Sequence, residues 1–258
     1  MSSDYVLQTT GLTKEFRGFT AVSDVNFKVR RGHIHALIGP NGAGKTTFFN
    51  LLTKFLLPTR GSIAFNGTDI TSERPAQTAR RGIVRSFQIS ATFPHLSVLE
   101  NVRVSLQRKL GTAFHFWRPA HSLRVLDDRA MELLAEVGLA DLADWTTADL
   151  PYGRKRALEL ATTLAQEPEL MLLDEPTQGM GHEDVASVTS LIKQVSKGRT
   201  ILMVEHNMGV VAGLCDAISV LQRGRVIAEG SYDEVSRNPQ VVEAYMGDAS
   251  AHLGGGHG

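Results

Sequence analysis

The sequence predicts an α/β fold with an antiparallel β edge and an inserted helical subdomain. Residues 170–173 and 200–204 are short, continuously apolar runs, which are typical of strands buried on both faces of a parallel sheet. Residues 97–142 instead place apolar side chains three and four positions apart, which indicates helices. Strands and helices that alternate on either side of this helical segment predict an α/β architecture.

The elements follow in order from the N-terminus. Apolar and polar residues alternate in the first thirty positions, which predicts antiparallel strands such as 5–8 and 25–29. Residues 33–38 form a short apolar run before a glycine-rich loop and a helical pattern, so they predict a strand, a loop and a helix. A further strand is expected at 61–67, and a helix opened by its proline at 75–81.

We expect a single domain over residues 1–248 with the helical insertion at about 90–152. The aromatic segment 111–119 is assigned to packing between the helices rather than to a ligand site. Two strands at 217–222 and 225–228 flank Arg223 and Gly224, which predicts a hairpin. The small, glycine-rich stretch 249–258 is predicted to be a disordered tail.

Composition excludes some classes of protein. The 258 residues carry 27 Lys and Arg against 27 Asp and Glu, a balance that argues against binding nucleic acid through bulk positive charge. The single cysteine, Cys215, cannot form an internal disulfide and is expected to be a small buried apolar residue. The sequence has no apolar run of about 18 residues and no signal peptide pattern, so we expect a cytosolic protein that reaches a membrane only through a partner.

The glycine-rich loop after the strand at 33–38 matches the pattern G-x-x-x-x-G-K-[ST] completely. Glycines let the backbone turn tightly, so that successive N–H groups point at phosphate oxygens, and the following helix directs its positive end to the same place. The Lys45 ammonium is expected to reach the terminal phosphates and to act in catalysis, and the Thr46 hydroxyl to ligate Mg²⁺. Nine residues are expected to bind the nucleotide: Gly39, Pro40, Asn41, Gly42, Ala43, Gly44, Lys45, Thr46 and Thr47.

Two carboxylates follow the apolar strand at 170–173. Asp174 and Glu175 are successive residues at a strand end, so they point to different sides of the chain and can perform different tasks. Asp174 is expected to hold Mg²⁺ through its water shell, and Glu175 to orient and polarise the attacking water. An apolar strand followed by two acids is a weak signal alone, but together with the phosphate-binding loop it indicates phosphoryl transfer.

These motifs together resemble the nucleotide-binding subunit of an ABC transporter over nearly the whole chain. GPNGAGKTT resembles Walker A, LMLLDEP Walker B, RSFQ the Q-loop and ILMVEH the H-loop. The resemblance implies a P-loop NTPase core. It also implies that Phe16 stacks on adenine, that Gln88 senses Mg²⁺ and contacts the membrane subunit, and that His206 touches the γ-phosphate. On their own, Gln88 and His206 would be ordinary polar residues after strands.

The signature segment departs from the family pattern. Family members commonly carry LSGGQ, and here the aligned residues are Leu150, Pro151, Tyr152, Gly153 and Arg154. Proline has neither a hydroxyl nor an N–H group, so residue 151 cannot donate to a γ-phosphate as the usual serine does. Pro151, Tyr152, Gly153 and Arg154 are expected to contact ATP bound to a second subunit. A further departure is Gly181, where the family usually has an aspartate that couples the two subunits.

Three consecutive cations follow the signature glycine. Arg154, Lys155 and Arg156 would lie in the first turn of a helix, where the macrodipole disfavours positive charge by about 0.3–1 kcal/mol each. One interpretation is that they are simply solvated. The other is that a facing anion offsets the cost, and the triphosphate on a second subunit is the obvious candidate.

LPYG, DEPTQGMG and the C-terminal segment GSYDEVSRNPQVVEAYMG resemble most the branched-chain amino acid importers of this family. The resemblance implies an ATP-hydrolysing subunit of an importer for branched-chain or other hydrophobic amino acids, with ATP and Mg²⁺ as cofactors. It implies a second ATP-binding subunit, identical or paralogous, two transmembrane permeases and, indirectly, a periplasmic solute-binding protein, with no nucleic acid. The chain would be peripheral on the inner face of the plasma membrane. An importer for another small solute such as urea or amides, and a weakly hydrolysing ATP-gated regulatory subunit, remain as alternatives.

Other classes of phosphate-binding protein fit less well. A GTPase would normally carry N-K-x-D to recognise guanine, and the sequence contains none. A P-loop kinase would need an acceptor, and a non-enzymatic scaffold would not need the Asp174 and Glu175 pair. A soluble ABC protein of DNA repair or translation would be expected to have two ATPase units or a long coiled-coil insertion.

Overall fold

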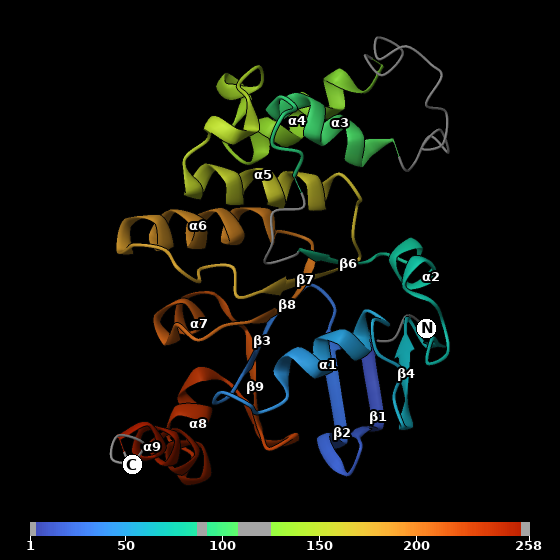
Figure 1. The fold of residues 1–258 in the computed structure, drawn as a ribbon, viewed down its shortest axis with the longest axis vertical. Helices are drawn as coiled ribbons and strands as arrows, with labels where there is room; N and C mark the ends of the chain where they lie inside the picture. Colours follow the sequence, from blue (N-terminus) through green and yellow to red (C-terminus); the bar gives the residue numbers. More distant parts are fainter. Residues whose placement is uncertain (1–3, 87–91, 108–124, 254–258) are drawn as a thin grey trace.

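The computed structural model describes residues 4–86, 92–107 and 125–253, with side chains up to Met246 (Figure 1). Within these residues the strands form two sheets. The four-stranded sheet has the order β2-β1-β4-β5 and is antiparallel throughout. The larger sheet has six strands in the order β10-β9-β3-β8-β7-β6, and only β10 runs antiparallel to its neighbour. The strand bounds are β1 Tyr5–Phe16, β2 Phe19–Arg30, β3 Ile34–Ile38, β4 Arg60–Phe65, β5 Thr68–Asp69, β6 Ile83–Ser86, β7 Leu170–Asp174, β8 Thr200–Val204, β9 Ala217–Gln222 and β10 Arg225–Gly230.

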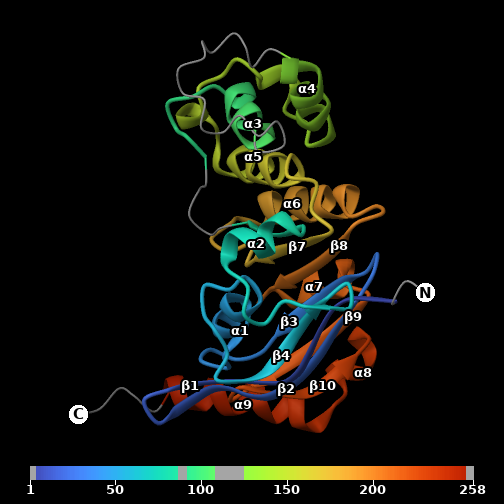
Figure 2. The ribbon, with the colours of Figure 1, turned by 90° about the vertical axis from the view of Figure 1, so that its right-hand side faces the viewer.

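The helices lie in layers around the larger sheet. In both views α3, α4 and α5 lie together at one end of the molecule, α6 lies between them and the sheet, and α8 and α9 lie at the opposite end (Figures 1 and 2). The α-helix bounds are α1 Lys45–Leu52, α2 Pro75–Arg80, α3 Val98–Leu106, α4 Asp127–Glu136, α5 Tyr152–Leu164, α6 His182–Val195, α7 Met208–Leu214, α8 Tyr232–Ser236 and α9 Pro239–Leu253. Two short 3₁₀ turns, η2 Ala140–Leu142 and η3 Thr147–Asp149, connect α4 to α5.

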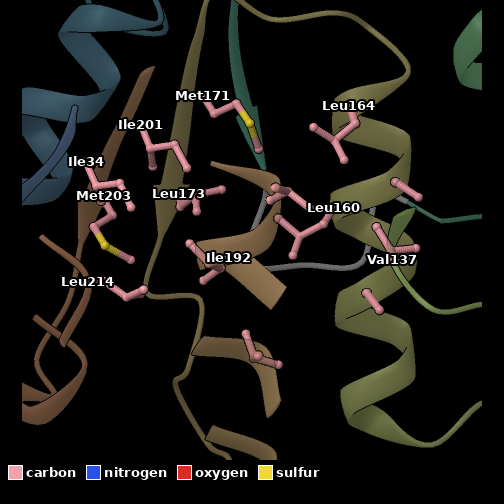
Figure 3. Packing of buried hydrophobic residues seen from close by; sticks show 14 of the residues in the cluster. Ile34, Val137, Leu160, Leu164, Met171, Leu173, Ile192, Ile201, Met203 and Leu214 are labelled. Atoms are coloured by element: carbon pink, nitrogen blue, oxygen red, sulfur yellow. The ribbon is translucent and has the colours of Figure 1, made fainter. Parts of the chain in front are cut away.

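The larger sheet is buried on both faces, as its apolar strands predict. Side chains at alternate positions of a strand point to opposite faces. On β7, Met171 and Leu173 pack with Leu160 of α5 and Ile192 of α6 in one hydrophobic cluster (Figure 3). The intervening Leu170 and Leu172 belong to a second cluster with Phe27 of β2 and Phe48 of α1. The sheet is therefore held between a helical layer and the antiparallel sheet.

Parallel strands bring the sequence motifs to one edge. Strands β3, β8, β7 and β6 run in the same direction, so their carboxyl ends lie at the same edge of the sheet. The glycine loop follows β3 directly, Asp174 ends β7, and His206 lies two residues beyond the end of β8. In open α/β sheets, ligands bind at the carboxyl ends of the parallel strands. The predicted motifs lie at that edge of this sheet.

Several expected boundaries differ from the observed ones. Strands β1 and β2 are each 12 residues long and form one extended hairpin, whereas the sequence pattern marks only short parts of them. Helix α5 begins at Tyr152, where the helical insertion was expected to end, and it packs on α3 and α4 and also on α6 and β6. Helix α9 continues to Leu253, past the predicted start of the tail at residue 249. The aromatic segment 111–119 lies outside the described residues.

The glycine loop passes very close to two neighbouring strands. A Cβ atom added at Gly39 would lie 2.0 Å from the carbonyl oxygen of Leu221, and one added at Gly44 would lie 2.3 Å from that of Ala21. Both glycines also have positive φ angles, 149° and 103°. Ala43 accepts a hydrogen bond at 2.8 Å from the amide of Gly224 in the β9–β10 turn. Only glycine at these two positions allows the backbone of the neighbouring strands to approach the loop this closely.

Replacing Gly39 by Ala is expected to destabilise the fold far more than replacing Gly42 by Ala. Gly42 also has a positive φ, 74°, but an added Cβ there meets nothing within 4 Å. Gly42→Ala should cost about 1–2 kcal/mol of unfolding free energy from backbone strain alone. Gly39→Ala should cost more, because a backbone carbonyl must also move. Urea unfolding of both variants checks this, and equal losses would contradict the packing described for the loop.

A buried histidine makes stability depend on pH. His35 on β3 donates through Nε2 to the hydroxyl of Ser219, 2.9 Å away, since that hydroxyl itself donates to Glu229. Its ring lies 4.8 Å from that of Phe27. Burial, with a smaller contribution from the charge of His33, lowers the pKa of His35 from 6.5 to about 4.

The unfolded chain should therefore bind a proton at His35 before the folded chain does. Stability conferred by the neutral ring is complete above pH 6.5 and is lost as the pH falls towards 4, by about 2–3 kcal/mol between pH 7 and 4.5. His35→Asn should flatten this part of the curve of unfolding free energy against pH. An unchanged slope in that variant would show that His35 titrates normally in the folded protein.

Candidate nucleotide site

The glycine loop leaves the start of α1 open to an anion. Gly44 is the N-cap residue, and no side chain caps the helix there. The first N–H groups of a helix have no partner within the helix, and the helix dipole adds a partial positive charge at the same end. Asn41, Gly42 and Thr46 are exposed around this end, and Thr47 is partly exposed. The loop therefore has the geometry of a phosphate cradle.

Lys45 is buried at the base of the loop, with 6% of its surface exposed. Its ammonium donates to the carbonyl oxygens of Gly39, at 2.7 Å, and Pro40, at 2.9 Å. These two carbonyls hold the cation within the loop that is expected to receive the phosphates. A phosphate anion would be a stronger partner than a neutral carbonyl.

Asp174 is almost fully buried and pairs with a cation from the neighbouring strand. The Arg85 guanidinium of β6 donates through Nη2 to Oδ2 of Asp174 and through Nη1 to Oδ1 of Asn50, 2.7 Å away. Asn50 lies on α1, so this arginine connects the helix of the glycine loop to the strand of the acidic motif. The sequence motifs gave no indication of Asn50, and they assigned no role to Arg85, which begins the RSFQ segment.

Glu175 and His206 form the next contact along this edge. Nε2 of His206 lies 2.9 Å from Oε1 of Glu175. The Glu175 side chain is mostly buried and its φ angle is 49°, an uncommon backbone conformation for a non-glycine residue. Its amide donates to the carbonyl of Val204 at the end of β8, which fixes this turn. The two residues predicted to act on the attacking water and the γ-phosphate are thus in direct contact.

Glu205 joins the loops that follow β7 and β8. It is 3% exposed, and its carboxylate accepts hydrogen bonds from four donors. Oε1 accepts from the amide and hydroxyl of Thr177, and Oε2 from the amides of His206 and Asn207. Glu205 therefore positions His206 without facing solvent itself. In the sequence, the feature that could have identified Glu205 is its position as a charged residue between an apolar strand and a histidine.

A cavity of about 350 Å³ lies where these loops meet. Asn41 of the glycine loop, Glu175 and His206 line it, together with Gln178 and Met180. The three motifs predicted to surround a terminal phosphate thus share one hollow at the edge of the sheet.

The signature segment lies at the start of α5. Pro151 is the N-cap residue, and the Tyr152 hydroxyl donates to the carbonyl of Gln178 at 3.3 Å. Gly153 lies close to Asp184 of α6, because an added Cβ would be 3.0 Å from Oδ1 of that residue. Gly181 is the N-cap of α6, and nothing lies within 4 Å of its added Cβ.

Each of the three cations after the signature glycine has a partner within the chain. Arg154 donates to the carbonyl of Gly138 at 2.9 Å, and Lys155 to that of Ala148 at 2.8 Å. Arg156 forms a buried ion pair with Glu159, at 2.7 Å. The unfavourable position of these charges at a helix start is therefore offset within the subunit, so a facing triphosphate is not needed to explain them.

Two more residues, Phe16 and Gln88, were predicted to belong to the site, and the structure describes only Phe16. Phe16 pairs with Phe19 at the end of the β1–β2 hairpin, and 41% of the residue is exposed. Ala21 of the same hairpin contacts Gly44, so this hairpin end lies beside the glycine loop. Gln88 lies outside the described residues.

The C-terminal helix lies on the other side of the glycine loop. A cavity of about 560 Å³ separates Pro40–Ala43 from Gln240 and Glu243 of α9. Burial raises the pKa of Tyr245 on the same helix to about 12, and a hydrogen bond with the backbone of Gly39 opposes the rise. No sequence motif links this helix to the loop.

The residues at this edge fit a magnesium ion that arrives with a nucleotide. Mg²⁺ is usually bound by one or two carboxylates and substrate phosphates rather than by a full protein cage. The described residues contain no cluster of three or more His, Cys, Asp or Glu residues that could hold a metal ion alone. They do contain an exposed hydroxyl at Thr46 and a buried carboxylate at Asp174 that already requires a cation.

Comparisons with known proteins agree with this geometry. The family model described as ABC transporter matches residues 22–178, and one described as branched-chain amino acid ATP-binding cassette transporter matches residues 225–251. The chain is 37% identical over 251 residues to the high-affinity branched-chain amino acid transport ATP-binding protein BraF of Pseudomonas aeruginosa, covering 95% of this chain and 98% of the relative. It is 36% identical over 256 residues to LivG of Escherichia coli, a protein with the same description, covering 96% and 100%.

The fold matches solved structures of such cassettes. The ADP conformation of MJ1267, described as an ATP-binding cassette of an ABC transporter, superposes with a TM-score of 0.83 at 30% sequence identity and covers 94% of this chain and 99% of that one. CbiO1 from Clostridium perfringens, part of an ABC transporter complex, superposes with a TM-score of 0.77 and covers 98% of each chain at 28% identity. The predicted fold class and the resemblance are confirmed: the chain belongs to the family of ABC transporter ATP-binding cassettes.

Proposed function

We propose that the chain is the ATP-hydrolysing subunit of an importer for branched-chain or other hydrophobic amino acids. Relatives that align over almost their full lengths are described as ATP-binding proteins of branched-chain amino acid transport. The match at residues 225–251 adds support, because it covers β10, α8 and most of α9, beyond the general cassette model. An importer for urea or amides has no comparable observation in its favour.

One observation carries the proposed activity. The glycine loop, Asp174 and the Glu175–His206 pair come from three different strands and meet at one edge of the sheet. Asn41 of the loop lines one cavity there together with Glu175 and His206. This is the set of groups that phosphoryl transfer to water requires: a cradle for the phosphates, a metal ligand and a residue to orient the water.

The chain's residues would share the work as follows. The backbone N–H groups of residues 41–46 and the Lys45 ammonium would bind the phosphates of ATP and stabilise the negative charge that develops on the transferred group. Thr46 and Asp174 would hold Mg²⁺, which when bound neutralises charge on the β- and γ-phosphates. Glu175 would accept a proton from the attacking water, so that ATP and water give ADP and phosphate. His206 would fix the orientation of the Glu175 carboxylate and donate to the γ-phosphate.

The proposal includes a second ATP-binding subunit, identical or paralogous. The chain has one glycine loop and one signature segment, and these lie on different elements, β3–α1 and the start of α5. In the proposed arrangement, ATP held by one subunit is covered by Gly153 and the start of α5 of the other. Pro151 cannot donate, so the helix start rather than a side chain at that position would supply the contact.

The remaining partners follow from the proposed import. No described helix has both the length and the apolar character needed to span a membrane. In the proposed importer, two permease subunits would hold the chain at the inner face of the plasma membrane, and a periplasmic binding protein would select the solute. Phe16 would stack on adenine, and Gln88 would link the site to the permeases. If Pro151 and Gly181 prevented closure, the chain would act instead as a weakly hydrolysing regulatory subunit.

Replacing Glu175 by Gln is expected to preserve ATP binding and stop turnover. Glutamine keeps the size of the side chain and a contact with His206 but cannot accept the proton, so turnover should fall at least about 100-fold. ATP affinity should stay within about threefold of wild type. Glu132→Gln is a matched control, because that carboxylate is exposed on α4 and should affect neither value. Normal hydrolysis by the Glu175 variant would refute the assigned base.

The solute class is tested with the assembled importer. The chain, purified with its permeases and placed in lipid vesicles, should hydrolyse ATP faster when a binding protein loaded with leucine or isoleucine is added. The same binding protein offered urea should give no increase. Stimulation by urea or an amide, without any response to branched-chain amino acids, would favour the alternative importer.

A further inference from the structure

Arg85 lies between three elements of the proposed ATP site. It projects from β6, next to β7 in the sheet, and only 11% of its side chain is exposed. Its two terminal nitrogens contact Asp174 of β7 and Asn50 of α1, and its guanidinium lies 5.8 Å from the ring centre of Phe49. The side chain is therefore fixed by contacts on several sides.

Asp174, the ion-pair partner of Arg85, carries a buried negative charge that needs a nearby positive charge. The Asp174 side chain is only 5% exposed, so its carboxylate is largely removed from water. A buried carboxylate without a partner is strongly destabilising. With no metal bound, the guanidinium supplies the compensating positive charge.

Mg²⁺ would change this balance. The proposed metal position is also beside Asp174, so the ion and the guanidinium would share one carboxylate. Two cations that share a partner in a site with little water repel each other more strongly than they would in bulk water. The pair with Arg85 uses Oδ2 of Asp174.

We propose that Arg85 is the counter-ion of Asp174 in the metal-free protein and that it competes electrostatically with Mg²⁺. It stabilises the empty site and sets the magnesium concentration at which the nucleotide is bound with its metal. Arg85 is a positioning residue, because it acts through its contacts with Asp174 and Asn50. The inference rests on the proposed function only in assuming that Mg²⁺ enters with ATP.

The first test uses thermal unfolding in EDTA without nucleotide. Arg85→Gln removes the charge and leaves the Asp174 carboxylate without its cation, so the midpoint should fall by more than about 5 °C. Arg81→Gln is the matched control, since Arg81 forms an ion pair with Glu73 nearer the surface and should change the midpoint little. In an Asp174→Asn background the loss caused by Arg85→Gln should shrink clearly. Equal losses in both backgrounds would overturn the ion pair as the source of stability.

The second test distinguishes competition between Arg85 and Mg²⁺ from a purely structural role of Arg85. Binding of a fluorescent, non-hydrolysable ATP analogue is followed as Mg²⁺ is added. Arg85→Gln should lower the half-saturating Mg²⁺ concentration at least about threefold, because a competing cation has been removed. Arg85→Lys keeps the positive charge and should stay near wild type, which also guards against a poorly folded Gln variant.

The outcomes of these tests are distinct. If Arg85 were only a structural support, its loss would leave the Mg²⁺ requirement unchanged or raise it, and either result would overturn the competition. If the wild-type chain bound no analogue at any Mg²⁺ concentration, the proposed function would fail instead. The unfolding test in EDTA would still show whether the Arg85–Asp174 ion pair stabilises the fold.

Discussion

The parallel alignment of β3, β8, β7 and β6 is the constraint on which the rest of the structure depends. Their shared direction puts the glycine loop, the two carboxylates and His206 at one edge, although these residues are up to 167 positions apart in the sequence. Burial of the sheet on both faces keeps this edge in register, because a one-residue slip would exchange the side chains of the two hydrophobic clusters.

Charge at this edge is balanced within the chain. Lys45 is held by two carbonyls, Asp174 by Arg85, and Glu205 by four donors from neighbouring loops. A nucleotide with its metal would thus exchange partners in a site that is already organised, rather than create the site. Such preorganisation lowers the cost of aligning charged groups when the reaction occurs.

Patterns of neighbouring residues in the sequence were enough to predict the buried strands and the glycine loop. The apolar runs at β7 and β8 identify buried strands, and the G-x-x-x-x-G-K-T motif identifies the turn from β3 into α1, because each depends on neighbouring residues alone. The pairing of Arg85 with Asp174 joins residues 89 apart in the sequence and depends on the order of strands, which no local pattern reveals. The same applies to Tyr245, whose contact with the glycine loop requires α9 to fold back across the molecule.

The cations of α5 show the opposite case, in which a local rule gave an incomplete expectation. Arg154, Lys155 and Arg156 oppose the dipole of their own helix, which suggested an external anion. Their partners are the carbonyls of Gly138 and Ala148 and the carboxylate of Glu159. Two of these lie on other elements, so the compensation becomes visible only in the folded chain.

Equilibrium binding of adenine nucleotides to the purified chain tests the central claim most directly. Calorimetric titration with magnesium should show about one ATP or ADP per chain and much weaker binding of AMP, because the loop grips the outer phosphates. Lys45→Ala should weaken ATP binding at least about tenfold, as a charged hydrogen bond is lost. A chain that retained no adenine nucleotide, or a Lys45→Ala variant that bound ATP as well as wild type, would contradict the account.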